Sequence, residues 1–150
     1  MAIAWAGHAG HANDRNRSIA LKLLEPLFAV TGISFVSIQR ELRGDDVARI
    51  AQHGITHFGD ELADMADTAA VIALADLTIA VDTSVVHLAG AMGRNVWVLL
   101  PSSPDWRWTL GGERSPWYPH ARLFRQPALE DWPAAIAKAR DALSQFAKAE

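Results

Sequence analysis

The chain has 150 residues, which is enough for one domain with a sizeable core and too few for two ordinary domains. Half of the residues are apolar, 21% are charged and the formal net charge is −3, which excludes a disordered chain and a basic surface for nucleic acid. Cysteine is absent, so disulfides and thiolate chemistry are excluded, and no apolar run approaches the roughly 20 residues that span a bilayer.

Short apolar runs alternate along the chain with longer helical patterns, which is typical of βαβ units and a mostly parallel sheet. Strands are predicted at residues 3–6, 33–38, 56–58, 77–81, 96–100 and 122–124. Helices are predicted from about residue 22 to Gly32, at 44–52, at 67–75 with Asp67 as the cap, at 85–92 ending at Gly93, and from Pro133 onward. Together these elements predict a doubly wound, Rossmann-like α/β fold in a single domain over residues 1–150.

The first residues lack the positive and apolar regions of a signal peptide, so we expect a cytoplasmic protein. The first strand begins almost at the first residue, which suggests a fragment or a very short gene product. Because the chain has no basic surface and no long apolar run, we expect neither a nucleic-acid partner nor a membrane-spanning segment.

A polar loop follows the first strand, at residues 8–18, where α/β folds bind their ligands. Guanidinium groups bind phosphate oxygens in a bidentate fork, so Arg15 or Arg17 is a candidate clamp for a diphosphate. The alternative is a solvated loop whose arginines are ordinary surface charges. The same loop holds His8, His11 and Asp14, but a zinc site is disfavoured because they lie in a flexible loop without cysteine.

The strongest signal is a buried strand at 77–81 that leads directly into Asp82, Thr83 and Ser84 at the start of a helix. The first turn of a helix has unpaired N–H groups and the positive end of the helix dipole, so it attracts a phosphate. His87 follows one turn later and is a further candidate donor. The alternative is that one of Asp82, Thr83 and Ser84 is simply the cap of the helix and that His87 is a partly buried packing residue.

Other common sites are disfavoured. The chain has no G-x-G-x-x-G after the first strand and no P-loop motif, and the acidic cluster of a receiver domain is missing near the first strand. Three tryptophans fall on predicted elements and are expected in the core: Trp5, Trp97 and Trp132. Three more lie in the long loop at 102–119, where they either stack on a sugar or base or, as we favour, fold the loop over the sheet edge: Trp106, Trp108 and Trp117.

Several stretches carry a resemblance to a known family: Trp5-Ala-Gly, Asn13-Asp-Arg-Asn-Arg-Ser18, Ser37-Ile-Gln39, Asp82-Thr-Ser-Val-Val-His87-Leu-Ala-Gly, and Pro104-Asp-Trp-Arg-Trp108 with Ser115-Pro-Trp-Tyr118. They resemble the C-terminal domain of GT-B glycosyltransferases, in particular the heptosyltransferase-type domain at the end of bacterial tetratricopeptide-repeat proteins. The resemblance covers nearly the whole chain. Its most specific parts are the run that begins at Asp82 and the tryptophan-rich loop.

The resemblance implies a domain that binds a nucleotide-sugar donor at the carboxyl ends of its strands, without a metal or other cofactor. In that family a separate domain holds the acceptor and usually the catalytic base. By matching position, Arg17 is expected to meet the diphosphate and Gln39 to contact the nucleoside. Thr83, Ser84 and His87 are expected to lie around the phosphates. Asp82 is expected to orient that turn or to contact the donor.

The expected function is therefore the donor-binding half of a glycosyltransferase, which is incomplete for catalysis without an acceptor domain. Its expected partners are a nucleotide-sugar and either an acceptor domain or a second copy of the chain. No catalytic residue is assigned, and the nucleotide, the sugar and the acceptor stay open. The alternative is a non-catalytic module of the same fold that serves assembly or regulation.

Overall fold

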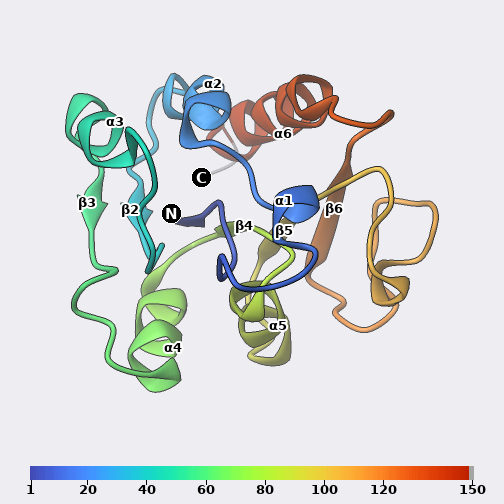
Figure 1. Ribbon diagram of the computed structural model, residues 1–150, viewed down its shortest axis with the longest axis horizontal. Helices are drawn as coiled ribbons and strands as arrows, with labels where there is room; N and C mark the ends of the chain where they lie inside the picture. The colour runs from blue at the N-terminus through green and yellow to red at the C-terminus, as the bar shows by residue number, and fades with distance from the viewer. Residues whose placement is uncertain (149–150) are drawn as a thin grey trace.

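The computed structural model describes residues 1–148 and shows a sheet between two layers of helices (Figure 1). Within these residues the sheet has six strands in the order β3-β2-β1-β4-β5-β6, and all neighbouring pairs are parallel. The strands are β1 (Ala2–Ala4), β2 (Val36–Ser37), β3 (Thr56–His57), β4 (Thr78–Val81), β5 (Val96–Leu100) and β6 (Ala121–Arg125). The predicted doubly wound α/β fold is confirmed, and residues 149–150 of the predicted domain lie outside the described part.

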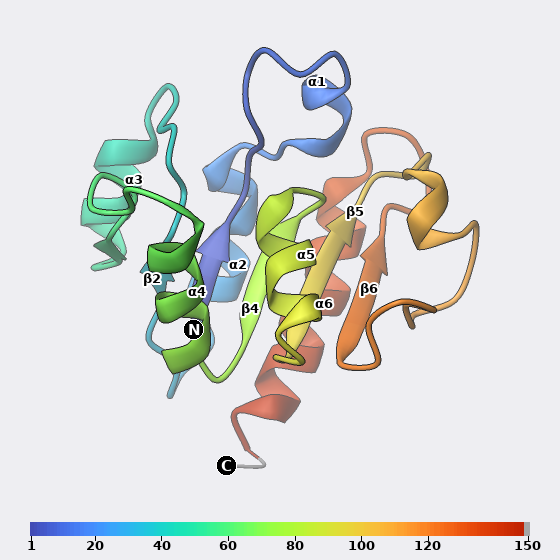
Figure 2. The same cartoon turned by 90° about the horizontal axis from the view of Figure 1, so that it is seen from below.

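Helices cover both faces of the sheet (Figure 1). One face carries η1 (Leu21–Leu24), α2 (Glu25–Phe28), α3 (Asp46–Gln52) and α6 (Trp132–Phe146), and the other carries α4 (Met65–Leu74) and α5 (Ser84–Ala91). Two single turns, α1 (Asp14–Arg17) and η2 (Trp106–Trp108), lie in the loops that follow β1 and β5 (Figure 2). Of the helices in the described range, none has the length and apolar content needed to cross a bilayer.

The central strands alternate between two cores because successive side chains point to opposite faces of a sheet. Ile79 and Leu99 pack with α2 and α6 on one face, whereas Ala80 and Val98 pack with α4 and α5 on the other. All positions of β4 and β5 are buried. This two-sided burial explains why both strands are continuous apolar runs in the sequence.

Two predicted elements differ most from those observed. The predicted helix that starts near residue 22 divides into η1 and α2, because Pro26 has no N–H and is accommodated only in the first turn of α2. The predicted strand at 33–38 pairs only over β2, and Ser34 at its start is exposed. By contrast, Gly93 ends α5 as predicted, with a φ of 67° that a residue without a side chain adopts readily.

The prediction that Asp67 caps a helix is wrong, because α4 begins two residues earlier and Asp64 is its cap. The backbone of Asp64 is extended, and its carboxylate accepts hydrogen bonds from the N–H groups of Ala66 at 2.7 Å and Asp67 at 3.1 Å. Asp67 lies within the first turn and accepts in return from the N–H of Asp64. This reciprocal pair is a capping box, which the spacing of two aspartates conceals from a search for Ser-x-x-Glu.

We expect Asp64→Ala to lower the free energy of unfolding by about 1 kcal/mol, since it leaves N–H groups of the first turn without an acceptor. Urea unfolding followed by circular dichroism measures the change. The matched control is Glu61→Ala, an exposed acidic residue in the loop before α4, for which we expect no measurable change. Equal losses in both variants would contradict the capping role.

The strand order places one crevice in the sheet. From β1 to β3 each new strand is added on the same side of the sheet. The next strand, β4, pairs with the opposite side of β1, so the direction of strand addition reverses there. Open α/β sheets bind ligands where the strand order reverses, outside the carboxyl ends of the strands. In this fold that position lies between β1 and β4, at the carboxyl ends of the strands, where α1 also lies (Figure 2).

Candidate functional site

An open cleft of about 680 Å³ lies at the carboxyl ends of β1, β2 and β4. Its polar lining comes from His8 and Arg17 after β1, from residues 39–41 after β2, from Thr68 in α4, and from the start of α5. Four of the residues predicted from the sequence therefore meet in one cleft, namely Arg17, Gln39, Thr83 and Ser84. Asp82 and His87, which were predicted to join them, are not part of its lining.

Arg17 is held against the inner wall of this cleft. Its side chain is 16% exposed, and its Nη1 donates a hydrogen bond of 2.9 Å to the main-chain carbonyl oxygen of Asp82. Its Nε lies 3.9 Å from Asp14 Oδ1 and has no hydrogen-bond partner among the described residues. A Cβ atom on Gly7 would lie 2.5 Å from Arg17 Nη2, so a larger residue at this position would force the guanidinium to shift. The loop after β1 is thus an ordered support for one cation.

The start of α5 faces the same cleft. Thr83 occupies the cap position with extended backbone, but no side chain in the described part of the chain caps this helix. The Thr83 hydroxyl oxygen is buried and has no hydrogen-bond partner within residues 1–148. Ser84 follows at an exposed position. The helix start therefore presents N–H groups, the exposed residue Ser84 and the positive end of its dipole to the cleft, which together suit an anion.

Gln39 lines the cleft, but main-chain groups already use its side-chain amide. Its Oε1 accepts hydrogen bonds of 2.9 Å from the N–H groups of both Trp5 and Ala6. Its Nε2 donates to the carbonyl oxygens of Ala6 at 3.0 Å and Glu41 at 3.2 Å. The residue is 3% exposed. Gln39 thus joins the ends of β1 and β2, and this use of the amide is not visible in the sequence.

Asp82 and His87 belong to an aromatic cluster instead. His87 Nε2 lies 3.5 Å from Asp82 Oδ1, and His87 Nδ1 lies 3.0 Å from the hydroxyl oxygen of Tyr118. The imidazole stacks on Trp108, with ring centroids 5.2 Å apart. Burial, the largest influence, favours the neutral acid, but His87, the nearby indole N–H of Trp108 and the charge of Arg107 outweigh it and lower the pKa of Asp82. These residues anchor the tryptophan-rich loop to α5.

The six tryptophans differ in burial. Those on helices and strands are buried, as predicted, whereas those in the long loop differ from one another. Trp5, Trp97 and Trp132 are buried, which confirms their predicted place in the core. In the loop, Trp108 is fully buried, whereas Trp106 and Trp117 are 72% and 57% exposed. The loop is therefore folded onto the domain through Trp108, and the other two rings pack against each other at its surface.

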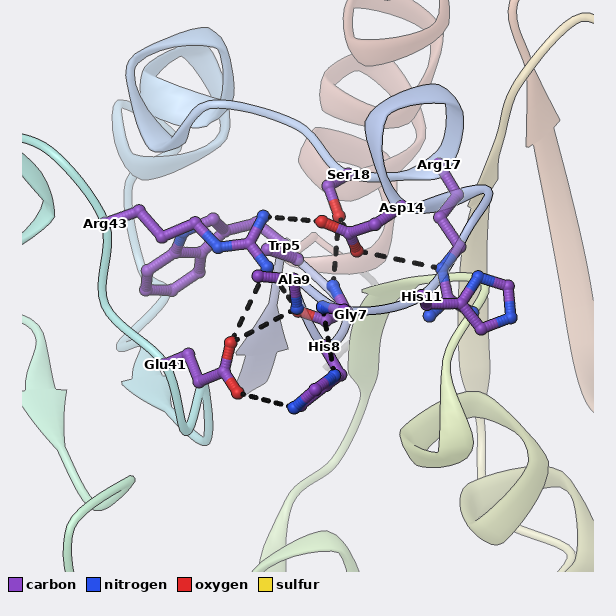
Figure 3. Close-up of polar contacts among 12 residues, drawn as sticks. Trp5, Gly7, His8, Ala9, His11, Asp14, Arg17, Ser18, Glu41 and Arg43 are labelled. Carbon is purple, nitrogen blue, oxygen red and sulfur yellow. Dashed lines mark hydrogen bonds and ion pairs between the residues drawn. The ribbon is translucent and has the colours of Figure 1, made fainter.

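The loop after β1 is less open to solvent than its composition indicates. Asp14 is buried, and its carboxylate accepts hydrogen bonds of 2.7 Å from both Ser18 Oγ and Arg43 Nη1 (Figure 3). His8, weighed with Asp14 as a zinc ligand, instead lies 3.5 Å from Glu41. Sequence reasoning missed Arg43. Its position after the second strand, at the same edge of a parallel sheet, was the available signal.

The folded chain keeps Asp14 ionised. Burial is the largest influence and favours the neutral acid, but the hydrogen bonds from Ser18 and Arg43 and the charges of Arg43 and Arg17 lower the pKa of Asp14. A lowered pKa in the folded state means that the ionised carboxylate stabilises the fold above the unfolded-state pKa of about 4. This contribution is lost as the pH falls through the lower, folded-state pKa.

We therefore expect Asp14→Asn to be less stable than the wild type at pH 7, with a difference that shrinks below about pH 4. Urea unfolding at pH 7 and pH 3 measures both differences. Asp60→Asn, at a position whose side chain is 88% exposed, is the matched control and should show little change at either pH. A deficit of Asp14→Asn that is the same at both pH values would contradict this assignment.

Comparison with known proteins adds one relative. No protein-family model matches the chain. The chain is similar to Protein FlbA of Caulobacter vibrioides (strain ATCC 19089 / CIP 103742 / CB 15), with 29% identity over 153 residues, which covers 98% of this chain and 25% of that protein. The chain thus spans about a quarter of the length of this relative. The name FlbA states neither a ligand nor a reaction.

Proposed function

We propose that the cleft binds the diphosphate of a nucleotide-sugar, and that the chain is the donor-binding half of a heptosyltransferase-like GT-B glycosyltransferase. One observation carries the proposal. Arg17 and the uncapped start of α5 line the same cleft where the strand order reverses, although they are far apart in the sequence. A fixed cation beside free helix N–H groups is the arrangement that receives phosphate oxygens.

The start of α5 alone cannot supply the free energy of binding, so Arg17 must contribute as well. An anion at a helix start gains about 0.3–1 kcal/mol, or about 2 kcal/mol when partly buried. A ligand with micromolar affinity needs roughly 8 kcal/mol. A charge-assisted hydrogen bond from an arginine adds about 1.5–3 kcal/mol, and the remainder must come from the nucleoside and the sugar. A cleft of about 680 Å³ is large enough for a ligand of that size.

In the proposed transfer reaction, the leaving group is the nucleoside diphosphate. Its negative charge grows as the bond to the sugar breaks, and donors that are already in place stabilise it without reorganising. Arg17, Thr83 and the N–H groups of α5 are such donors. No metal is needed for this step. The acceptor site belongs to another domain or to a second copy of the chain, and the reaction takes place in the cytoplasm. No residue of this chain is assigned to catalysis.

The second candidate is a non-catalytic module of the same fold for assembly or regulation. It is favoured by Gln39, whose amide oxygen and nitrogen each make two hydrogen bonds to the main chain. An amide that is fully used in this way has no donor or acceptor left for a nucleoside. Binding measurements separate the two candidates.

The test is calorimetric titration of the chain with UDP, GDP, ADP and their sugars, beside Arg17→Ala, Thr83→Ala and the double variant. We expect one nucleotide to bind, and we expect Arg17→Ala to weaken it at least tenfold. Arg15→Ala is the matched control, because Arg15 is exposed on the same turn and does not line the cleft. Failure of every nucleotide to bind at millimolar concentration would reject the donor site and favour the module.

A further inference from the structure

Asp14 is the centre of a polar network behind the cleft (Figure 3). One carboxylate oxygen accepts from Ser18 Oγ at 2.7 Å, and the other accepts from Arg43 Nη1 at 2.7 Å. Arg17 Nε lies farther away, 3.9 Å from the oxygen that Ser18 also contacts. Because Ser18 and Arg43 satisfy the carboxylate first, Asp14 orients Arg17 without forming a close pair with it.

Arg43 is fixed at both ends. Its main-chain N–H donates to Asp46 Oδ2 at 2.9 Å, and the same oxygen accepts from the indole Nε1 of Trp5 at 3.0 Å. Its Nη2 donates to the carbonyl oxygen of Gly7 at 2.6 Å. Arg43 therefore holds two groups that border Arg17, the carboxylate of Asp14 and the main chain of Gly7.

The charges in this network alternate. Arg43, Asp14 and Arg17 together carry one net positive charge, and of the three only Arg17 lines the cleft. Glu41 lies 3.7 Å from Arg43, but its side chain is 45% exposed, so water screens its charge. Without Arg43, the buried carboxylate of Asp14 would have Arg17 as its remaining cationic partner, and the closer pair would draw the guanidinium away from the cleft.

We infer that Arg43, which does not line the cleft, is a positioning residue that acts through Asp14 to hold Arg17 in place and free to bind a diphosphate. The inference rests on the proposed function, because it concerns how the same cleft receives its ligand. It adds a residue that the resemblance did not indicate, and it assigns Arg43 to positioning rather than to catalysis.

The test is a double-mutant cycle, in which the affinity of UDP, GDP and ADP is measured by calorimetry. We expect Arg43→Gln to weaken the nucleotide that binds the wild type about tenfold, the size of one charge-assisted hydrogen bond. In the background of Arg17→Lys, which keeps a charge and some affinity, we expect the same change to have less than about a twofold effect. Arg43→Lys should bind more tightly than Arg43→Gln but less tightly than the wild type, since lysine keeps the positive charge and lacks the two-pronged guanidinium.

Thermal unfolding of each variant checks folding. The matched control is Arg49→Gln, which breaks ion pairs with Glu25 and Asp45 elsewhere on the molecule and should leave the affinity unchanged. Equal losses from Arg43→Gln in the two backgrounds, or no loss, would overturn the positioning role while the proposed function stands. A wild type that binds none of the three nucleotides would overturn both.

Discussion

Trp108→Ala is expected to lower the free energy of unfolding by about 4 kcal/mol, a large part of the total stability of a domain of this size. The side chain is fully buried between the tryptophan-rich loop and α5, where it stacks on His87. Its removal leaves a cavity and detaches the loop from the helix. Guanidinium unfolding followed by circular dichroism measures the loss.

Trp106→Ala is the control, because it removes the same side chain two positions earlier in the same loop. Trp106 is 72% exposed and contacts Trp117 and Arg107 at the surface. We expect a loss of about 1 kcal/mol or less. If the two variants were equally stable, Trp108 would not be the anchor of the loop.

Gln39→Ala is the second large prediction, with an expected loss of about 3 kcal/mol in the free energy of unfolding. The substitution leaves main-chain N–H groups of Trp5 and Ala6 and a carbonyl oxygen of Ala6 buried without partners. Each buried polar group that loses its partner costs about 1–3 kcal/mol, and partial relaxation reduces the sum. Urea unfolding at neutral pH measures the difference.

The control is Gln52→Ala, an exposed glutamine at the end of α3, where we expect a change within about 0.5 kcal/mol. A small effect of Gln39→Ala on stability, together with weaker nucleotide binding, would contradict the structural role. That result would restore the nucleoside contact that the resemblance implies for Gln39.

The fold was largely predictable because its local patterns are strong. Buried parallel strands are continuous apolar runs, and the strands at 77–81 and 96–100 were placed within one residue of β4 and β5. Element ends were less predictable where two residues compete for one role. Asp64 and Asp67 are both good caps, and only the backbone conformation decides that Asp64 has that role.

The candidate site was predictable in part. Arg17, Thr83 and Ser84 follow strands whose carboxyl ends meet at one edge of a parallel sheet, so their sequence positions already indicate a shared site. His87 is one turn farther along α5, where the side chain meets Trp108 and Tyr118 instead of the cleft. That contact depends on how a distant loop folds back, which local pattern does not reveal.

The sequence by itself determined the class of fold, the parallel sheet and the polar loops that follow its strands, because apolar period and turn residues act over short distances. Only the tertiary structure decided which polar side chains face the cleft and which serve the scaffold. Gln39, Asp14 and Arg43 are polar residues in or behind the candidate cleft, yet their side-chain hydrogen bonds go to the main chain, to one another and to Ser18. Such partners lie up to 36 residues away in the chain, and a buried polar group is committed only when the fold brings its partner to it.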